Sequence, residues 1–245
     1  MMKLDKNAVV LFSGDSITDG NRGKSMDCNH IMGHGYQYII ASKLALENAE
    51  NMPKFINKGY SGENAVDLLA KWHNDVIINK PTVLSILVGV NEGSYGYFKG
   101  LSPEQAKNRY ETGMRAILEL TRKELGDIKI ILCEPFYCPL EKSDSPYEFT
   151  PHPDGVENPF ERPDTHDPVD SVGYRLEVNK KIREVAPKIA EDYGCVFVPL
   201  YDKIYENASK SRIEYFMWDG THPSIAGHML IAEEWFNMLN ELENV

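Results

Sequence analysis

The chain lacks the long apolar segments that mark membrane or exported proteins. Its first apolar run covers only residues 8–12, whereas a membrane helix needs about 20 apolar residues and a secretory signal about 7–15. Cysteine is also scarce, since the 245 residues include four and no two form a C-x-x-C pair. We therefore expect an intracellular, cytoplasmic protein with reduced thiols and no disulfide framework.

Positive charge is scarce as well. Lys and Arg number 26 against 37 Asp and Glu, which gives a net charge of −11. Nucleic acids and anionic membranes attract basic surfaces, so we expect neither as a partner. We also expect no metal or cofactor. His30 and His34 lack a complete set of metal ligands nearby, and the glycines of 33–35 do not follow an expected strand as a dinucleotide-binding motif requires.

Five short apolar segments are the strongest structural signal in the sequence. They are nearly continuous rather than alternating, which favours a parallel sheet covered on both faces. The expected strands are 8–12, 54–57, 83–88, 128–133 and 195–198. Helical patterns alternate with them at 36–48, 63–78, 102–125, 175–193 and 224–239.

This alternation indicates βαβ units and a three-layer α/β/α sandwich around a five-stranded parallel sheet. We expect the flavodoxin-like strand order 2-1-3-4-5 and a single domain over residues 1–245, because no linker divides the chain. One proline-rich stretch, 139–173, has no clear period. Long loops in compact domains tend to be functional, so we interpret it as a lid or a contact in a homo-oligomer, with disorder as the alternative.

Residues suited to chemistry follow the first expected strand and precede the last expected helix. Ser16 stands at a strand-to-helix turn, and Asp219 and His222 are three positions apart near the other end of the chain. A serine hydroxyl needs a base within hydrogen-bond reach, and the base needs an orienting partner. We therefore predict Ser16 as nucleophile, His222 as base and Asp219 as its partner.

A carbonyl attacked by serine also needs donors for its developing negative charge. The backbone N–H groups of Ser16 and Gly62 and the side-chain amide of Asn91 follow three different expected strands. The carboxyl ends of parallel strands share one edge of the sheet, so we predict these groups as an oxyanion hole. Each motif alone is also typical of a turn or a helix cap. Their joint occurrence in this order favours the catalytic interpretation.

Together, these motifs resemble those of the GDSL esterases and lipases of the SGNH hydrolase superfamily. The matching blocks are SGDSITDG at 13–20, NKGYSGEN at 57–64, GVNE at 89–92 and DGTHP at 219–223. The resemblance implies a three-layer fold, a serine nucleophile, a His–Asp pair and three oxyanion donors, without a metal.

The third block departs from the usual Gly-x-Asn-Asp of that superfamily, because Glu92 replaces the aspartate. Asn91 is kept, so we expect altered contacts around it rather than lost activity. The stretch 139–173 also looks longer than in simple members. The second block and the WDGTHP ending at 218–223 look closest to the bacterial carbohydrate O-acetylesterases.

We therefore expect a carboxylic ester hydrolase that removes small acyl groups, acetyl foremost, from a hydroxylated substrate such as a carbohydrate, through an acyl-enzyme on Ser16. The alternatives are a lysophospholipase or thioesterase acting on longer chains, and a non-catalytic carbohydrate-binding relative. The candidate substrate-pocket residues are Asp15, Tyr60, Glu92, Tyr95 and Trp218.

Overall fold

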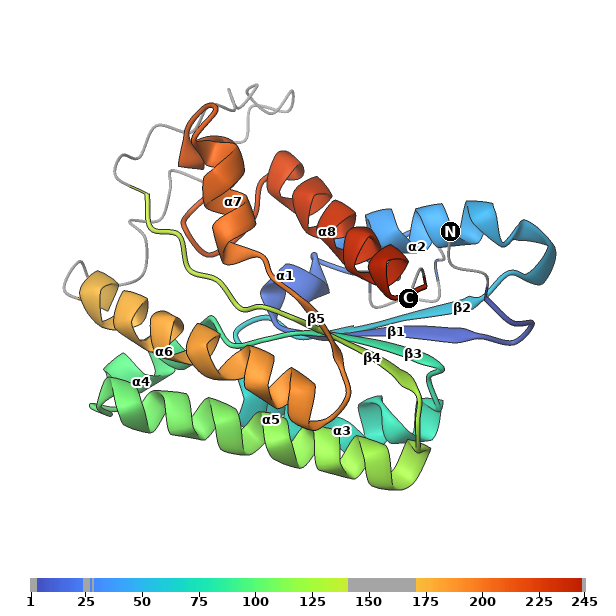
Figure 1. Ribbon diagram of the computed structural model, residues 1–245, viewed down its shortest axis with the longest axis horizontal. Coiled ribbons are helices and arrows are strands. Elements are labelled where there is room, and N and C mark those ends of the chain that lie inside the picture. Colours follow the sequence, from blue (N-terminus) through green and yellow to red (C-terminus); the bar gives the residue numbers. More distant parts are fainter. Residues whose placement is uncertain (1–3, 24–26, 28, 141–170, 244–245) are drawn as a thin grey trace.

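The structure is a computed structural model that describes residues 4–23, 27, 29–140 and 171–243. Its centre is a five-stranded parallel sheet with the order β2-β1-β3-β4-β5, which confirms the predicted order. The strands are β1 (Val9–Gly14), β2 (Lys54–Gly59), β3 (Val83–Leu87), β4 (Lys129–Cys133) and β5 (Val196–Val198). Helices cover both faces of the sheet and complete a three-layer sandwich (Figure 1).

The apolar runs form strands because each supplies side chains to two cores. All five residues of β3 are buried. In β1, Phe12 packs in the core under the helices of one face, and its neighbour Leu11 packs in the core under the other. Successive side chains of a strand point to opposite faces, so a continuous apolar run is buried on both.

Two groups of helices cover the sheet (Figure 1). One face carries α1 (Ser16–Asp19), α2 (Tyr36–Glu47), α7 (Tyr201–Ala208) and α8 (Ile225–Glu243). The other carries α3 (Ala65–Asp75), α4 (Asn91–Phe98), α5 (Pro103–Leu125) and α6 (Ser171–Asp192). Short 3-10 turns occur at Ala49–Asn51, Ile77–Asn79 and Ile213–Tyr215.

Local capping signals set the ends of the long helices. The Ser102 hydroxyl accepts a hydrogen bond from the Gln105 N–H at 3.2 Å, and a proline follows at the first helical position of α5. The expected helix over 63–78 is shorter in the structure. Asn64 caps its start, so α3 begins at Ala65, and its last residues form a separate 3-10 turn.

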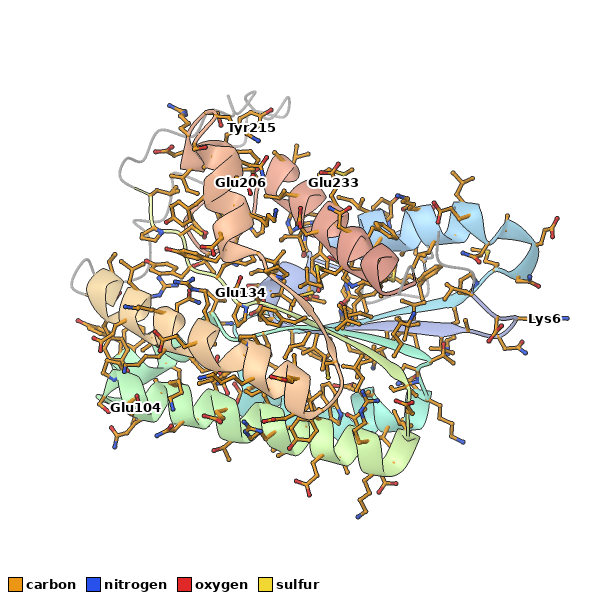
Figure 2. The ribbon with its side chains drawn as sticks, in the orientation of Figure 1. Lys6, Glu104, Glu134, Glu206, Tyr215 and Glu233 are labelled. Atoms are coloured by element: carbon orange, nitrogen blue, oxygen red, sulfur yellow. The ribbon has the colours of Figure 1, made fainter. Side chains whose placement is uncertain are left out.

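Three short helices, α1, α4 and α7, escape the sequence patterns because they are too short for a hydrophobic period. The start of α7 depends on a distant residue: the Glu134 carboxylate accepts hydrogen bonds from the N–H groups of Leu200 and Tyr201 at 2.7 and 2.9 Å. Figure 2 shows Glu134 near the middle of the molecule.

The predicted loop 139–173 falls mostly outside the described residues. Its last three residues are helical, because α6 begins at Ser171 rather than at Arg175. The predicted loop boundary at 173 and the predicted helix start are therefore wrong by a few residues, because Gly173, a weak helix former, interrupts the helical pattern at the start of α6.

The carboxyl ends of the first three strands meet at one edge of the sheet. Both β1 and β2 run two residues further than predicted, and Gly14 is paired with Gly59 on one side and with Leu87 on the other. A Cβ on Gly14 would lie 2.2 Å from the Leu87 carbonyl oxygen, so only glycine fits there. The segments after these strands therefore emerge side by side.

Two further predictions concern membranes and thiols. Within the described ranges, no helix combines the length and apolar character that a bilayer crossing requires. Cys133, Cys138 and Cys195 are free thiols, and burial raises the pKa of the Cys133 thiol to about 12.

Candidate active site

Ser16 is the first residue of α1, just beyond the end of β1. Asp15 caps this helix from an extended backbone conformation, with its Oδ1 accepting a hydrogen bond from the Ile17 N–H at 3.0 Å. The first N–H groups of a helix have no acceptor within it. The Ser16 N–H therefore points out of the helix start, beside a half-buried hydroxyl.

The segment 217–223 holds His222 and Asp219 in one compact turn. An antiparallel bridge closes the segment, and the Trp218 N–H donates to the His222 carbonyl at 2.8 Å. Asp219 Oδ1 accepts hydrogen bonds from the N–H groups of Thr221 and His222 at 2.9 and 2.7 Å. The relative placement of the acid and the imidazole is thus fixed by local bonds.

The fold brings this turn against Ser16. Ser16 Oγ lies 2.8 Å from His222 Nε2, although the two residues are 206 positions apart in the sequence. On the other side of the imidazole ring, Nδ1 lies 2.7 Å from Asp219 Oδ2. Both distances are within hydrogen-bond reach, so the three predicted side chains form one connected series.

The charges of this series support each other. Burial alone would lower the pKa of His222, but the hydrogen bond and the charge of Asp219 outweigh it, and the net result is a raised pKa. Burial alone would raise the pKa of Asp219, but its bonds to His222 and the nearby backbone hold the pKa below the ordinary value. An ionised carboxylate therefore stands ready to stabilise an imidazolium.

Asp15 lies beneath the site rather than on its surface. The residue is only 1% exposed, so the prediction that it lines a substrate pocket is wrong. Burial raises the pKa of its carboxyl to about 7, against the hydrogen bond from Ile17 and the charge of His222. Its Oδ2 has no hydrogen-bond partner among the described residues.

Gly62 and Asn91 lie at the same edge of the sheet as Ser16, after β2 and β3. Gly62 has a φ of +83°, and a Cβ there would meet no atom within 4 Å, so its backbone faces open space. Asn91 Nδ2 donates to the carbonyl of Glu63 at 2.9 Å, next to Gly62. An amide nitrogen carries two hydrogens, so one remains for a further acceptor.

Glu92 is fully buried behind Asn91, which contradicts the prediction that it lines a pocket. Its Oε1 accepts a hydrogen bond from the Ala65 N–H, the first of α3, at 2.8 Å. Burial raises the pKa of Glu92 to about 7, and the charge of Asp15 adds to the effect. The glutamate thus joins the start of α4 to the start of α3, beside Gly62.

The three aromatic candidates differ in their surroundings. Tyr60 donates its hydroxyl to Asp75 at 3.0 Å, and two cationic side chains lie over its ring. The Tyr95 ring lies 4.3 Å from the Arg109 guanidinium. The Trp218 ring lies 6.4 Å from the His222 ring.

Sequence reasoning missed Arg175, a buried residue in the first turns of α6. Its Nη2 donates to Thr221 Oγ1 at 2.9 Å, inside the turn that holds His222, and its guanidinium lies 3.9 Å from the centre of the Tyr137 ring. Its charge opposes the rise in the pKa of His222. In the sequence it stands only at the start of a helical pattern, so no local signal identifies it.

A cavity of about 470 Å³ adjoins the catalytic turn and was also not predicted. Its lining residues are His34, Ile39, Trp218, Pro223, Ser224, Ile225 and His228. The described part of the chain contains no group of three or more His, Cys, Asp or Glu side chains placed to hold a metal.

Known proteins resemble this chain in sequence and in fold. An acetylxylan esterase from Geobacillus stearothermophilus is 29% identical over 235 residues, which cover 94% of this chain and 93% of that protein. A crystal structure of the acetylxylan esterase from that organism has a TM-score of 0.72 at 26% identity, covering 97% of this chain and 96% of the other. Catalytic mutants of the Geobacillus esterase replace a serine, an aspartate and a histidine with alanine.

A protein from Parabacteroides merdae, assigned as a GDSL-like lipase, has a crystal structure with a TM-score of 0.76 at 29% identity, covering 97% of this chain and 98% of the other. The model of the GDSL-like Lipase/Acylhydrolase family matches residues 12–230, which include Ser16, Asp219 and His222. The chain therefore belongs to the GDSL-like lipase/acylhydrolase family and is a carboxylic ester hydrolase.

Proposed function

We propose that the protein is a serine esterase that removes small acyl groups, acetyl foremost, from a hydroxylated substrate such as a carbohydrate. The hydrogen-bonded series from Ser16 through His222 to Asp219 carries the proposed mechanism. The similarity to an acetylxylan esterase supports the choice of acyl group and substrate.

In the first half of the reaction, Ser16 Oγ attacks the ester carbonyl carbon while His222 Nε2 takes the hydroxyl proton. The carbonyl oxygen becomes negatively charged and accepts hydrogen bonds from Ser16 N–H, Gly62 N–H and the Asn91 amide. Each such donor contributes about 3–4 kcal/mol to the transition state. The bond to the alcohol oxygen then breaks, and His222 gives its proton to that oxygen.

In the second half, water attacks the acyl group on Ser16. His222 accepts a proton from the water, and the same donors hold the oxyanion. The bond to Ser16 Oγ breaks, His222 returns the proton to it, and the carboxylic acid leaves. Asp219 stays ionised in both halves and stabilises the imidazolium.

The Ser16→Ala variant tests the nucleophile. We expect a folded protein, by circular dichroism, whose kcat/KM on p-nitrophenyl acetate is at least about 10³-fold below wild type. Ser61→Ala is the matched control, because Ser61 is an exposed serine at the same edge of the sheet, and it should keep its activity. A folded Ser16→Ala protein with wild-type turnover would rule out the mechanism.

Two further measurements separate this proposal from its alternatives. A series of p-nitrophenyl esters of increasing chain length should give its highest kcat/KM at acetate, whereas a lysophospholipase or thioesterase would prefer longer chains. A fluorophosphonate probe should label Ser16 in the folded protein, which a non-catalytic carbohydrate-binding relative would not allow.

A further inference from the structure

Two segments far apart in the sequence line the cavity beside the turn that holds His222. One wall comes from the segment before α2, where the His34 N–H donates to the carbonyl of Gly20 at 3.0 Å. Gly20 is the C-cap of α1, the helix that Ser16 begins. The opposite wall is formed by Trp218 and Pro223, from the turn that holds His222. The cavity lining is therefore bonded to the end of α1 on one side and belongs to the turn of His222 on the other.

The chemistry of ester hydrolysis suits this cavity to the alcohol half of an ester substrate. His222 must reach the leaving oxygen to return its proton, so the alcohol lies on the side of the imidazole. The cavity adjoins the turn that carries this imidazole, since Trp218 and Pro223, which line it, are close to His222 in the chain. Gly62 and Asn91, which face the carbonyl oxygen in the proposed mechanism, are not among the lining residues.

His228 presents a fixed hydrogen-bond donor to this cavity. Its Nδ1 lies 3.2 Å from the Tyr36 N–H and accepts its hydrogen bond. Burial lowers the pKa of His228 to about 4, with help from the charges of His34 and His222, so the ring is neutral near pH 7. A neutral imidazole that accepts at Nδ1 carries its proton on Nε2.

The remaining lining is mostly apolar. Trp218 offers an aromatic surface, and Ile39, Pro223 and Ile225 add aliphatic contacts. An apolar wall with one or two placed polar groups is typical of a small-molecule site. A sugar ring matches this lining because its C–H faces are apolar while its edge carries hydroxyl groups, and the cavity is large enough for one ring.

We propose that this cavity is the subsite for the leaving alcohol, that the alcohol is a sugar ring packed against Trp218, and that His228 Nε2–H donates a hydrogen bond to one of its oxygens. This inference rests on the proposed function, because it needs an ester whose alcohol half leaves from the side of His222. It adds to that function two binding residues for the alcohol half, Trp218 and His228.

Two substitutions of His228 separate hydrogen bonding to the sugar from support of the fold. In His228→Asn the amide oxygen takes the place of Nδ1 and keeps the Tyr36 contact, while the donor at Nε2 is lost. In His228→Gln the amide nitrogen takes the place of Nε2, while the Tyr36 contact is lost. His73→Asn, an exposed histidine on α3, is the control.

Each protein is assayed by acetate release from an acetylated methyl pyranoside and from ethyl acetate, which share the acyl group. We expect His228→Asn to lower the ratio of kcat/KM for the sugar ester over ethyl acetate at least fivefold, mainly through KM. His228→Gln should lower the ratio less, and His73→Asn should not change it. The free methyl pyranoside should inhibit ethyl acetate hydrolysis competitively, with a higher inhibition constant in His228→Asn.

Three results would overturn the inference. An unchanged kcat/KM ratio in His228→Asn would show that His228 does not bind the sugar. A larger fall of the ratio in His228→Gln than in His228→Asn would show that the Tyr36 contact, rather than the Nε2 donor, determines the effect. In both cases wild-type activity on ethyl acetate would leave the proposed esterase intact. A wild-type protein inert toward both esters would overturn the inference together with the proposed function.

Discussion

The carboxylate of Glu92 accepts the first N–H of α3, from Ala65, at 2.8 Å. This bond joins the segment that follows β3 to the segment that follows β2. Asn91, the neighbour of Glu92, makes a second connection between the same segments through the Glu63 carbonyl. The glutamate that replaces the family's usual aspartate is therefore fully buried and fixes the start of α3, three residues after Gly62.

Glu92→Gln should make the protein more stable relative to wild type as the pH rises. The folded protein holds the Glu92 proton up to a pKa of about 7, whereas the unfolded chain releases it near the ordinary 4.5. Wild-type stability therefore falls as the pH rises between these values, because the unfolded state binds fewer protons there. The glutamine keeps the acceptor for the Ala65 N–H and cannot titrate, so it removes this fall. Its free energy of unfolding should gain on that of wild type by at most about 3 kcal/mol across this pH range.

Urea unfolding at several pH values from 4.5 to 8 measures this difference. Glu124→Gln, an exposed glutamate on α5, provides the control. A difference between Glu92→Gln and wild type that stays constant across the range would contradict a buried carboxyl that titrates near neutrality.

The acid limb of the pH–rate profile should report His222. The imidazole must be neutral to take the serine proton, and Asp219 raises its pKa above the ordinary 6.5. The value of kcat/KM should therefore fall as the pH drops, with a midpoint above 6.5. In Asp219→Asn the midpoint should move to lower pH and the rate should fall by about 10⁴, as the equivalent exchange does in serine proteases. A midpoint that Asp219→Asn leaves in place would assign the limb to another group.

Arg175→Gln should move the same midpoint in the opposite direction. The guanidinium charge lowers the pKa of His222, so its removal should raise the midpoint and reduce activity near pH 7 several-fold. Arg183→Gln is the matched control, because Arg183 is on the same helix and also stacks on an aromatic ring, Tyr201, at 3.5 Å. If both variants gave the same profile, Arg175 would have no specific effect on the catalytic turn.

A comparison of Gly62→Ala with Gly100→Ala should separate the effect of backbone strain on stability from an effect on kcat. Gly62 and Gly100 both have positive φ, +83° and +64°, and a Cβ at either position would meet nothing within 4 Å. In urea unfolding, the free energy of unfolding of each alanine variant should therefore fall by roughly 1–2 kcal/mol, because of the left-handed backbone alone. Only Gly62→Ala should also lose kcat, by tenfold or more, because a backbone that relaxes from the left-handed region moves the N–H, a proposed oxyanion donor, away from the carbonyl oxygen. Equal kcat in both variants would contradict this expected movement of the donor.

The sheet and the catalytic series are predictable because their signals are local. Each strand is a buried apolar run, and Ser16, Asp219 and His222 stand in short motifs. The strand ends were less predictable. Glycine is typical of turns, but Gly14 is part of β1. It is required there because the Leu87 carbonyl of the neighbouring strand leaves no room for a Cβ.

The rest depends on contacts between distant parts of the chain. The start of α7 is fixed by Glu134, 66 positions before Leu200, so no local pattern could reveal it. The burial of Asp15 and Glu92 results from the layers packed over them, and a polar residue after a strand gives no sign of it. His228 and Arg175 lie in ordinary helical patterns, and only the fold brings them to the catalytic turn.

The 206-residue separation of Ser16 and His222 has a consequence for how activity arises. The proposed nucleophile follows the first strand, whereas the proposed base directly precedes α8, which packs against α2. During synthesis from the amino terminus, the sheet and its serine can assemble before the last helix exists, but the serine stays inert until that helix docks. During refolding, the recovery of esterase activity should therefore follow the docking of α8. It should be slower than the spectroscopic change that accompanies formation of the sheet.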